Sequence, residues 1–341
     1  MQDNEQFTRV FYFEHERQTI NARVLLKHGS LLLLTFITAT IAGTLYPFGK
    51  LGIFAEGDPQ TWPELLQFLL LLPGQYVLTL ATAASSLLTD TSVLAHGLSF
   101  SLSLLFILVC HEMGHYIACR IYRVDATLPF FIPTPPMIGP AGTFGAFIKI
   151  LSPMPSRKAV FDIGVAGPIA GFIALLPISV IGVLTMQPAP PEAIANYSGI
   201  TFSDPILMQL IAAAAGIDLS ASYGNAFFYA AWIGLLVTAL NLIPSGQLDG
   251  GHAIYAVFGK AVHFWTGRIA FVVMAALSIL GMVYFNSPSG FLIAILLGVM
   301  MRIPHPQPWD ESPLDIKRKL IAIFVLAIFV VSFLPFPIKI T

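Results

Sequence analysis

One short stretch of the chain carries three side chains that can bind and use a metal ion. His111, Glu112 and His115 form an H-E-x-x-H pattern at the C-terminal end of a long apolar run. Residues four apart project from one face of a helix, so both imidazoles can bind one Zn²⁺ while the carboxylate addresses a water molecule beside it. Zinc lowers the pKa of such a water to about 7, and a nearby carboxylate can then accept its proton. The pattern predicts zinc-dependent hydrolysis with Glu112 as the general base.

A purely structural interpretation of the same residues is also open. In it, His111 and His115 are helix-end histidines at a membrane interface, bonded to lipid or backbone, and Glu112 pairs with Arg120 or Arg123. Ionisable residues at membrane depth are costly and are usually retained for function. Three of them within five positions therefore favour the metal site.

A catalytic zinc needs a third protein ligand and keeps one position open. The stretch 241–252, with the sequence NLIPSGQLDGGH, ends another apolar run and interrupts its helix at Pro244 and Gly246. Broken helices at membrane depth are tolerated where they line a polar cavity. We therefore predict Asp249 as the third ligand. His252 competes for that role, and Asp-Gly is also a common turn pair.

The two stretches together resemble the site-2 protease family of intramembrane zinc metalloproteases. The shared motifs are H-E-x-G-H on one transmembrane helix and N-x-x-P-x-x-x-L-D-G on a later one, and the resemblance covers about 94–260, including 164–168. It implies one Zn²⁺ per chain on His111, His115 and Asp249, Glu112 as general base and proton shuttle, and Asn241 as a contact to the substrate carbonyl or strand. His252 then contacts a metal ligand without binding the metal, or it has no role in the site.

The same resemblance implies what the protein acts on. Many family members carry a PDZ domain, which needs about 80–100 residues, and neither 120–158 nor 187–225 is long enough to hold one. The chain is more similar to the PDZ-lacking branch known from bacteria, cyanobacteria and chloroplasts. The implied activity is regulated cleavage of transmembrane protein substrates, in or near their membrane segments.

Composition places these residues in a membrane protein. Of 341 residues, 56% are hydrophobic and 10% are charged, and the mean hydropathy is +0.79, whereas about a quarter of an average soluble domain is charged. The formal net charge of −1 shows no basic excess, so a nucleic-acid partner is not expected. The lipid bilayer is the expected surroundings, and the oligomeric state cannot be inferred from composition.

The apolar segments predict an all-α polytopic fold with seven or eight transmembrane helices. We divide the chain into a cytoplasmic N-terminal segment, 1–29, and a single membrane domain, 30–341, with the catalytic core at about 94–260. About 20 apolar residues span a bilayer core. The candidate spans are 30–47, 64–86, 94–118, 159–185, 226–243, 269–286, 290–301 and 320–336.

The connection 120–158, after the zinc-motif helix, predicts short membrane-associated strands or loops. Its aromatic and apolar residues are punctuated by Pro and Gly, which is typical of short strands rather than a helix. An edge strand here could pair with an unwound substrate, and Gly142 and Gly145 would let the two backbones approach closely. The alternative is a plain Gly/Pro-rich connector.

The distribution of Lys and Arg predicts the orientation. Five of these residues lie in 120–158 and none lies between Lys158 and Lys260, and cytoplasmic loops hold the excess of basic residues. The active site should therefore lie nearer the cytoplasmic side, most simply of a bacterial cytoplasmic membrane. This orientation requires 64–86, which contains Pro73-Gly74, to be re-entrant or to lie on the surface rather than to cross.

Other assignments remain alternatives. A membrane metal or proton transporter could use His and Asp at mid-membrane. A different metallopeptidase would need a glutamate as third ligand, and only Glu192 and Glu311 lie downstream of the motif. Asp162 is expected to be a helix-start carboxylate, and the glycines 164, 167 and 171 are expected to mediate close helix packing.

Overall fold

Two long apolar helices in antiparallel contact, α4 (Thr91–Ile121) and α5 (Arg157–Leu184), form the centre of the fold. The computed structural model describes residues 21–52, 59–192, 199–303 and 305–340. Asp90 caps α4 by accepting from the backbone N–H groups of Ser92 and Val93, and Ser156 caps α5 in the same way. α8 (Ala226–Leu242) packs against both helices and completes a buried apolar core.

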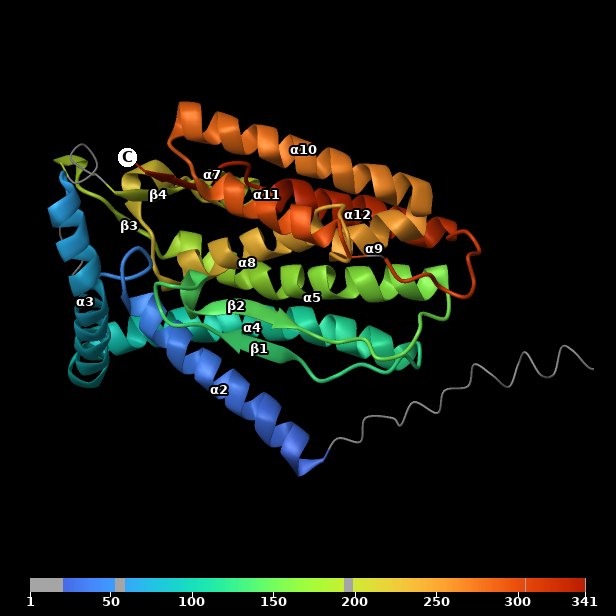
Figure 1. Cartoon of the computed structure of the whole chain (residues 1–341), viewed down its shortest axis with the longest axis horizontal. Coiled ribbons are helices and arrows are strands. Elements are labelled where there is room, and N and C mark those ends of the chain that lie inside the picture. The colour runs from blue at the N-terminus through green and yellow to red at the C-terminus, as the bar shows by residue number, and fades with distance from the viewer. Residues whose placement is uncertain (1–20, 53–58, 193–198, 304, 341) are drawn as a thin grey trace, which may run out of the picture.

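The remaining elements surround this three-helix centre, as Figure 1 shows. α10 (Lys260–Phe285) and α11 (Ser289–Met300) form a tight hairpin, and α9 (Asp249–Phe258) packs on α5. The other elements are α2 (Ala22–Thr44), α3 (Trp62–Thr89), α7 (Ile206–Ala215), α12 (Ile316–Ser332), the 3₁₀ turns η1 (Pro140–Gly142) and η2 (Leu219–Ala221), and the strands β1 (Phe130–Pro133), β2 (Thr143–Phe147), β3 (Gln187–Pro188), β4 (Ile200–Phe202), β5 (Ser222–Tyr223) and β6 (Ile338–Ile340).

A helix overlaps each of the eight predicted spans, and the fold is mostly helical. Within the described residues, five helices are long and apolar enough to cross a membrane: α2, α3, α4, α5 and α10. α8 and α12 have 17 residues each and α11 has 12. The predicted count of seven or eight crossings is therefore not established. The predicted N-terminal segment 1–29 lies mostly outside the described residues, and α2 already begins at Ala22.

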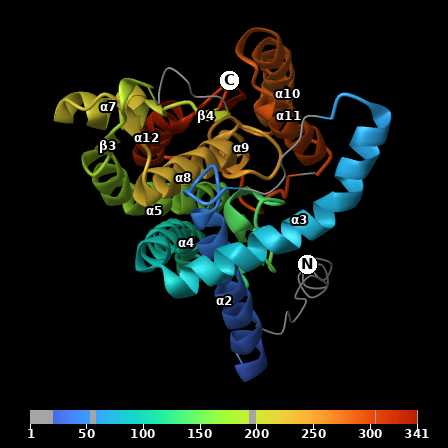
Figure 2. The same cartoon turned by 90° about the vertical axis from the view of Figure 1, so that its left-hand side faces the viewer.

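α3 differs in direction from the central helices. It is one continuous helix of 28 residues despite Pro73, so the chain does not turn back as a re-entrant element would. Figure 1 shows α3 running across one end of the bundle, roughly perpendicular to α4 and α5, and Figure 2 shows it passing in front of that end. This direction fits the surface-lying alternative, although its length and apolarity would also allow a crossing.

The chain after α4 contains the short strands predicted for 120–158. β1 and β2 pair antiparallel with Phe130 opposite Phe147 and Phe131 opposite Ala146. α2 packs against β1, where His28 Nδ1 donates to the Pro129 carbonyl at 2.8 Å and the His28 ring lies 4.1 Å from that of Phe130. The sheet has two strands, so β2 keeps one edge that pairs with no other described strand.

Asp162 does not act as a helix-start carboxylate. It is the sixth residue of α5, and its two oxygens accept from the guanidinium of Arg318 on α12, at 2.9 Å from Nε and 2.6 Å from Nη2. The hydroxyl of Tyr122, at the end of α4, also donates to Asp162. The macrodipole interpretation was therefore incomplete, because this carboxylate connects three helices.

Candidate active site

The structure brings the three predicted zinc ligands together. His111 and His115 lie on one face of α4, with their Nε2 atoms 3.2 Å apart. Asp249, the first residue of α9, places Oδ2 at 3.3 Å from His111 Nε2 and at 3.4 Å from His115 Nε2. Both imidazoles are buried. Among the described residues, these three form the one group of His, Cys, Asp or Glu whose ligand atoms cluster closely enough for a metal ion.

These separations fit a zinc ion. Tetrahedral Zn²⁺ has Zn–N distances of about 2.0–2.1 Å and Zn–O distances of about 2.0–2.2 Å, which put neighbouring ligand atoms about 3.3–3.5 Å apart. The three separations in the structure, 3.2, 3.3 and 3.4 Å, agree with that spacing to within about 0.1 Å. His115 Nδ1 donates to the Ile163 carbonyl at 2.7 Å, which leaves the lone pair of Nε2 for a metal, as in most metal-binding histidines.

Three glycines of α5 leave the space that the histidine rings occupy. A Cβ on Gly167 would lie 2.0 Å from His115 Nε2, and one on Gly171 would lie 3.1 Å from His111 Nδ1. A Cβ on Gly164 would lie 2.7 Å from the Cβ of His252. The predicted close packing of these glycines is present, and its partners are histidines of the site.

A tight turn places Asp249 opposite the two histidines. α8 ends at Leu242, and the chain reverses direction before α9 begins at Asp249. A Cβ on Gly250 would lie 2.0 Å from the carbonyl oxygen of Leu242, so only glycine allows this approach. Gly246 has a φ of +54°, and its carbonyl accepts from His263 Nε2 at 2.9 Å.

The metal-binding group opens into a cavity of about 640 Å³. Glu112 lines this cavity and is 5% exposed. Among the described residues no Arg or Lys lies within ion-pair distance of Glu112, so the proposed pairing with Arg120 or Arg123 is absent. The carboxylate therefore lies beside the metal-binding group without a cationic partner.

The other predicted site residues lie at different distances from this cavity. Asn241 lines it, and its Nδ2 lies 3.4 Å from His111 Nε2. Gly142 packs against α2, where a Cβ would lie 2.4 Å from the Thr38 carbonyl oxygen, and the Thr38 hydroxyl donates to the Gly142 carbonyl at 2.7 Å. Gly145 has a φ of +93° and open space around it. Neither glycine lines the cavity, whereas residues 146–150 do.

The sequence interpretation missed the segment 305–307 as part of the site. Pro306 and Gln307 line the catalytic cavity together with His252. His305 Nδ1 donates to the Pro306 carbonyl at 2.7 Å, so its Nε2 is left to accept from His252 Nδ1, also at 2.7 Å. Burial lowers the pKa of His305 to about 3, which keeps it neutral. No spacing rule connects residues 53 positions apart, so the sequence did not predict the contact between His252 and His305.

The alternative acidic ligands lie elsewhere. Glu311 accepts from the Tyr255 hydroxyl at 3.4 Å and lies outside the metal-binding group. Glu192 does not line the cavity either. His252, the other candidate for the third ligand, is bonded to His305 and is not part of the group. Asp249 is thus the third residue that the fold places beside the two histidines.

Several known proteins with similar sequences are described as probable zinc metalloproteases. The chain is 29% identical over 245 residues to "Probable zinc metalloprotease EGY1, chloroplastic" of Oryza sativa subsp. japonica, covering 70% of this chain and 41% of that protein. It is 27% identical over 257 residues to the EGY2 protein of Arabidopsis thaliana, covering 74% of this chain and 44% of the relative. The chain thus spans less than half the length of these relatives. Their chloroplastic description does not support the predicted bacterial cytoplasmic membrane.

No solved structure matches the chain. The sequence profile of Peptidase family M50 matches residues 99–282, which is more than half of the chain. This range contains His111, Glu112 and His115 of α4, the glycines of α5 and the turn that carries Asp249. The chain therefore belongs to Peptidase family M50, the site-2 protease family.

Proposed function

We propose that the chain is a zinc endopeptidase that cleaves other membrane proteins in or near their transmembrane segments. One observation carries the proposal: three ligand atoms from His111, His115 and Asp249 lie 3.2–3.4 Å apart beside the carboxylate of Glu112. Two of the ligands lie on α4, which is long and apolar enough to cross a bilayer. A hydrolytic site on such a helix is suited to substrates that lie in the membrane.

The residues of the cavity have separate tasks in this proposal. Zinc held by His111, His115 and Asp249 would acidify a water molecule and polarise the scissile carbonyl. Glu112 accepts the proton of the attacking water and returns it to the leaving amine. The side-chain amide of Asn241, next to His111, donates to the carbonyl oxygen as negative charge develops there.

A substrate helix must unwind before it can be cut, because its peptide bonds are hidden inside the helix. Residues 146–150, which begin at the end of β2, line the cavity. The edge of β2 that pairs with no other described strand offers a backbone with which an extended segment can pair. Gly145, with open space around it, allows a close approach of the substrate backbone. Gly142 instead contacts α2, and this contact holds the β1–β2 hairpin against that helix.

The basic residues support an orientation for the active site. The C-terminal end of α4 and the start of α12 lie at the same end of the bundle (Figure 1), and Arg120, Lys317 and Lys319 lie there. Cytoplasmic surfaces carry the excess of Lys and Arg. We therefore place the metal site nearer the cytoplasmic side of a single membrane domain, 30–341, with a catalytic core at about 94–260, so that the cut would release a membrane-held fragment inward.

The Glu112→Gln variant of the purified chain tests the proposal. It should retain about one zinc, because its ligands are intact, and lose cleavage of a transmembrane substrate by at least about 100-fold. Asp249→Ala should lose both zinc and cleavage. Glu311→Gln is the matched control and should behave as wild type, since Glu311 lies outside the metal-binding group. Undiminished proteolysis by Glu112→Gln would refute the proposed protease mechanism. A metal or proton transporter, by contrast, could retain ion transport in that variant.

A further inference from the structure

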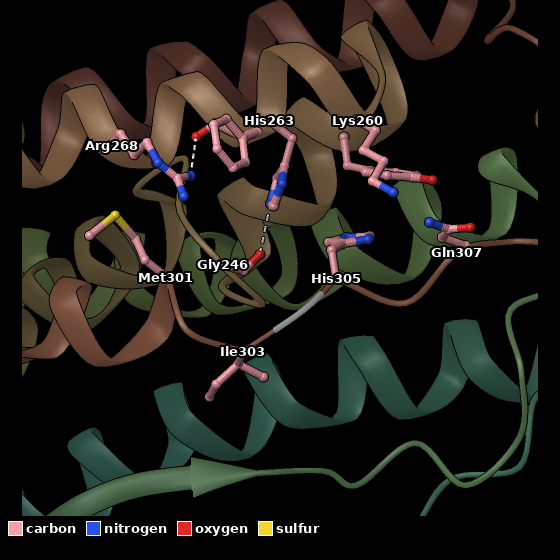
Figure 3. A pocket seen from close by; sticks show the side chains of 11 residues that line it. Gly246, Lys260, His263, Arg268, Met301, Ile303, His305 and Gln307 are labelled. Atoms are coloured by element: carbon pink, nitrogen blue, oxygen red, sulfur yellow. Dashed lines mark hydrogen bonds between the residues drawn. The ribbon is translucent and has the colours of Figure 1, made fainter.

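A second cavity adjoins the catalytic one at Gln307, which lines both. It has a volume of about 250 Å³, and Figure 3 shows Lys260, His263 and Arg268 projecting into it from α10, opposite His305 and Gln307. Its lining shares Gln307 with the catalytic cavity but none of the metal-binding residues. This pocket is therefore a separate candidate site beside the active site.

The pocket carries positive charge without a carboxylate to balance it. Lys260 and Arg268 line it, no acidic residue does, and Arg302 lies next to Met301 at its edge. Among the described residues, no carboxylate lies within ion-pair distance of these three cations. Arg268 Nη1 donates to the Phe264 carbonyl at 3.0 Å, which leaves its other donors for a ligand. The charge favours an anion.

An apolar groove continues from this pocket between α10 and α11. Its volume is about 470 Å³, Phe271, Ile295, Gly298 and Val299 line it, and Arg268 and Met301 belong to both cavities. Arg302 lies at the groove as well. A cationic pocket that opens directly into a groove on a pair of apolar helices matches a molecule with an anionic head and a hydrocarbon tail.

We propose that this site binds an anionic phospholipid. Its phosphate lies between Lys260 and Arg268, with Arg302 nearby, and one acyl chain lies in the groove against Phe271 and Val299. Basic pockets between membrane helices on the cytoplasmic side are suited to anionic lipid headgroups. Because Gln307 faces both cavities and His305 is bonded to His252, a bound lipid would contact the segment that forms a wall of the catalytic cavity.

Native mass spectrometry of the full chain with dioctanoyl phosphatidylglycerol or dioctanoyl phosphatidylcholine tests the proposal. The anionic lipid should bind more tightly. Lys260→Gln and Arg268→Gln should each weaken its binding about fivefold, as expected for one cation near a membrane phosphate, while the charge-preserving Lys260→Arg retains it. Lys317→Gln, which removes an exposed charge on α12 outside both cavities, is the matched control and should bind as wild type.

A groove variant separates a lipid from free phosphate. Gly298→Leu should fill the groove, since even its Cβ would lie 3.3 Å from the Phe271 ring, and should weaken phosphatidylglycerol binding without changing that of inorganic phosphate. Equal binding of the two lipids by wild type, or no loss in the Lys260→Gln/Arg268→Gln variant, would overturn the proposal. So would an unchanged lipid affinity of Gly298→Leu, which would leave a phosphate site only. The readout is binding, so it is independent of whether the chain is a protease.

Discussion

The rings of His111 and His115 fit between α4 and α5 only because α5 lacks side chains opposite them. Gly167 faces His115 and Gly171 faces His111, and a Cβ at either position would contact an imidazole atom. The same helix also supplies a hydrogen-bond acceptor for His115, because the Ile163 carbonyl accepts from His115 Nδ1. α5 therefore sets the position and the tautomer of a ligand that α4 supplies.

Gly167→Ala should reduce zinc binding, because the new methyl group would overlap His115 Nε2, which lies 2.0 Å from the ideal Cβ position. We expect at least about a tenfold loss of zinc affinity, as for changes in other groups that orient metal ligands, and a parallel loss of proteolysis. Zinc content after dialysis against a graded series of metal buffers measures the effect.

Gly74→Ala in α3 is the control for the helix-propensity effect of the same exchange. A Cβ at Gly74 would meet no neighbouring element within 4 Å. The substitution should therefore leave the zinc affinity unchanged, and the fold should be equally or slightly more stable. Wild-type zinc affinity in Gly167→Ala would show that the imidazole is not held where the structure places it.

The sequence allowed prediction of those site residues whose neighbours are close along the chain. His111, Glu112 and His115 lie within five positions on one helix, so their common face follows from helix geometry alone. The role of Gly167 did not follow from its spacing, because a small residue every three or four positions indicates close packing but not what packs there. That partner belongs to another helix, 52 positions away in the case of His115.

At the scale of elements, the turn after α8 and the β1–β2 hairpin bring the site together. The helix break at 244–246 was predictable from Pro and Gly, and so was the presence of strands after α4. The position of Gly142 was not, because it depends on a contact with Thr38 of α2. Likewise, Asp162 and Arg318 are 156 residues apart, and no local pattern connects an acidic residue in α5 with a basic one in α12.

The position of the hairpin predicts which of its residues meets the substrate. In the presence of an added thiol oxidant, a cysteine at Ile148, which lines the catalytic cavity, should form a disulfide with a cysteine placed next to the scissile bond of a transmembrane substrate. The same exchange at Phe144, which lies on β2 but is 64% exposed and outside the cavity, should give at least severalfold less product. Both variants need Glu112→Gln to preserve the substrate, and Cys110→Ser with Cys119→Ala to remove the free thiols.

Equal yields from the two positions would contradict this path, and a higher yield from Phe144 would place the substrate outside the catalytic cavity. Because the two residues lie only four positions apart, differences in expression or in the approach of the substrate to the hairpin as a whole affect both equally. The comparison therefore isolates the effect of lining the catalytic cavity.

At the scale of the whole molecule, an α3 that lies on the surface makes the fold consistent with the distribution of Lys and Arg. The end of α2 lies beside the start of α4, where Thr40 Oγ1 donates to Ser101 Oγ at 2.8 Å and His96 Nε2 donates to the Phe48 carbonyl at 2.9 Å. α3 connects these two ends across the bundle (Figure 2). If α2 and α4 cross in opposite directions, the basic residues at the end of α4 lie on the same side as the start of α2, as the excess of Lys and Arg requires.

Cysteine labelling in intact cells distinguishes the two placements of α3. Its 28 residues extend about 42 Å, longer than a hydrocarbon core of about 30 Å, so a crossing helix would put Trp62 and Ser220 on opposite sides. If α3 lies on the surface, an impermeant maleimide should label Trp62→Cys together with Ser220→Cys, in the turn before α8, and should label Lys317→Cys only after the membrane is permeabilised. Labelling of Trp62→Cys with the pattern of Lys317→Cys would make α3 a transmembrane helix. If both of these positions were labelled in intact cells, the end of α4, and the metal site with it, would lie on the side opposite to the one proposed.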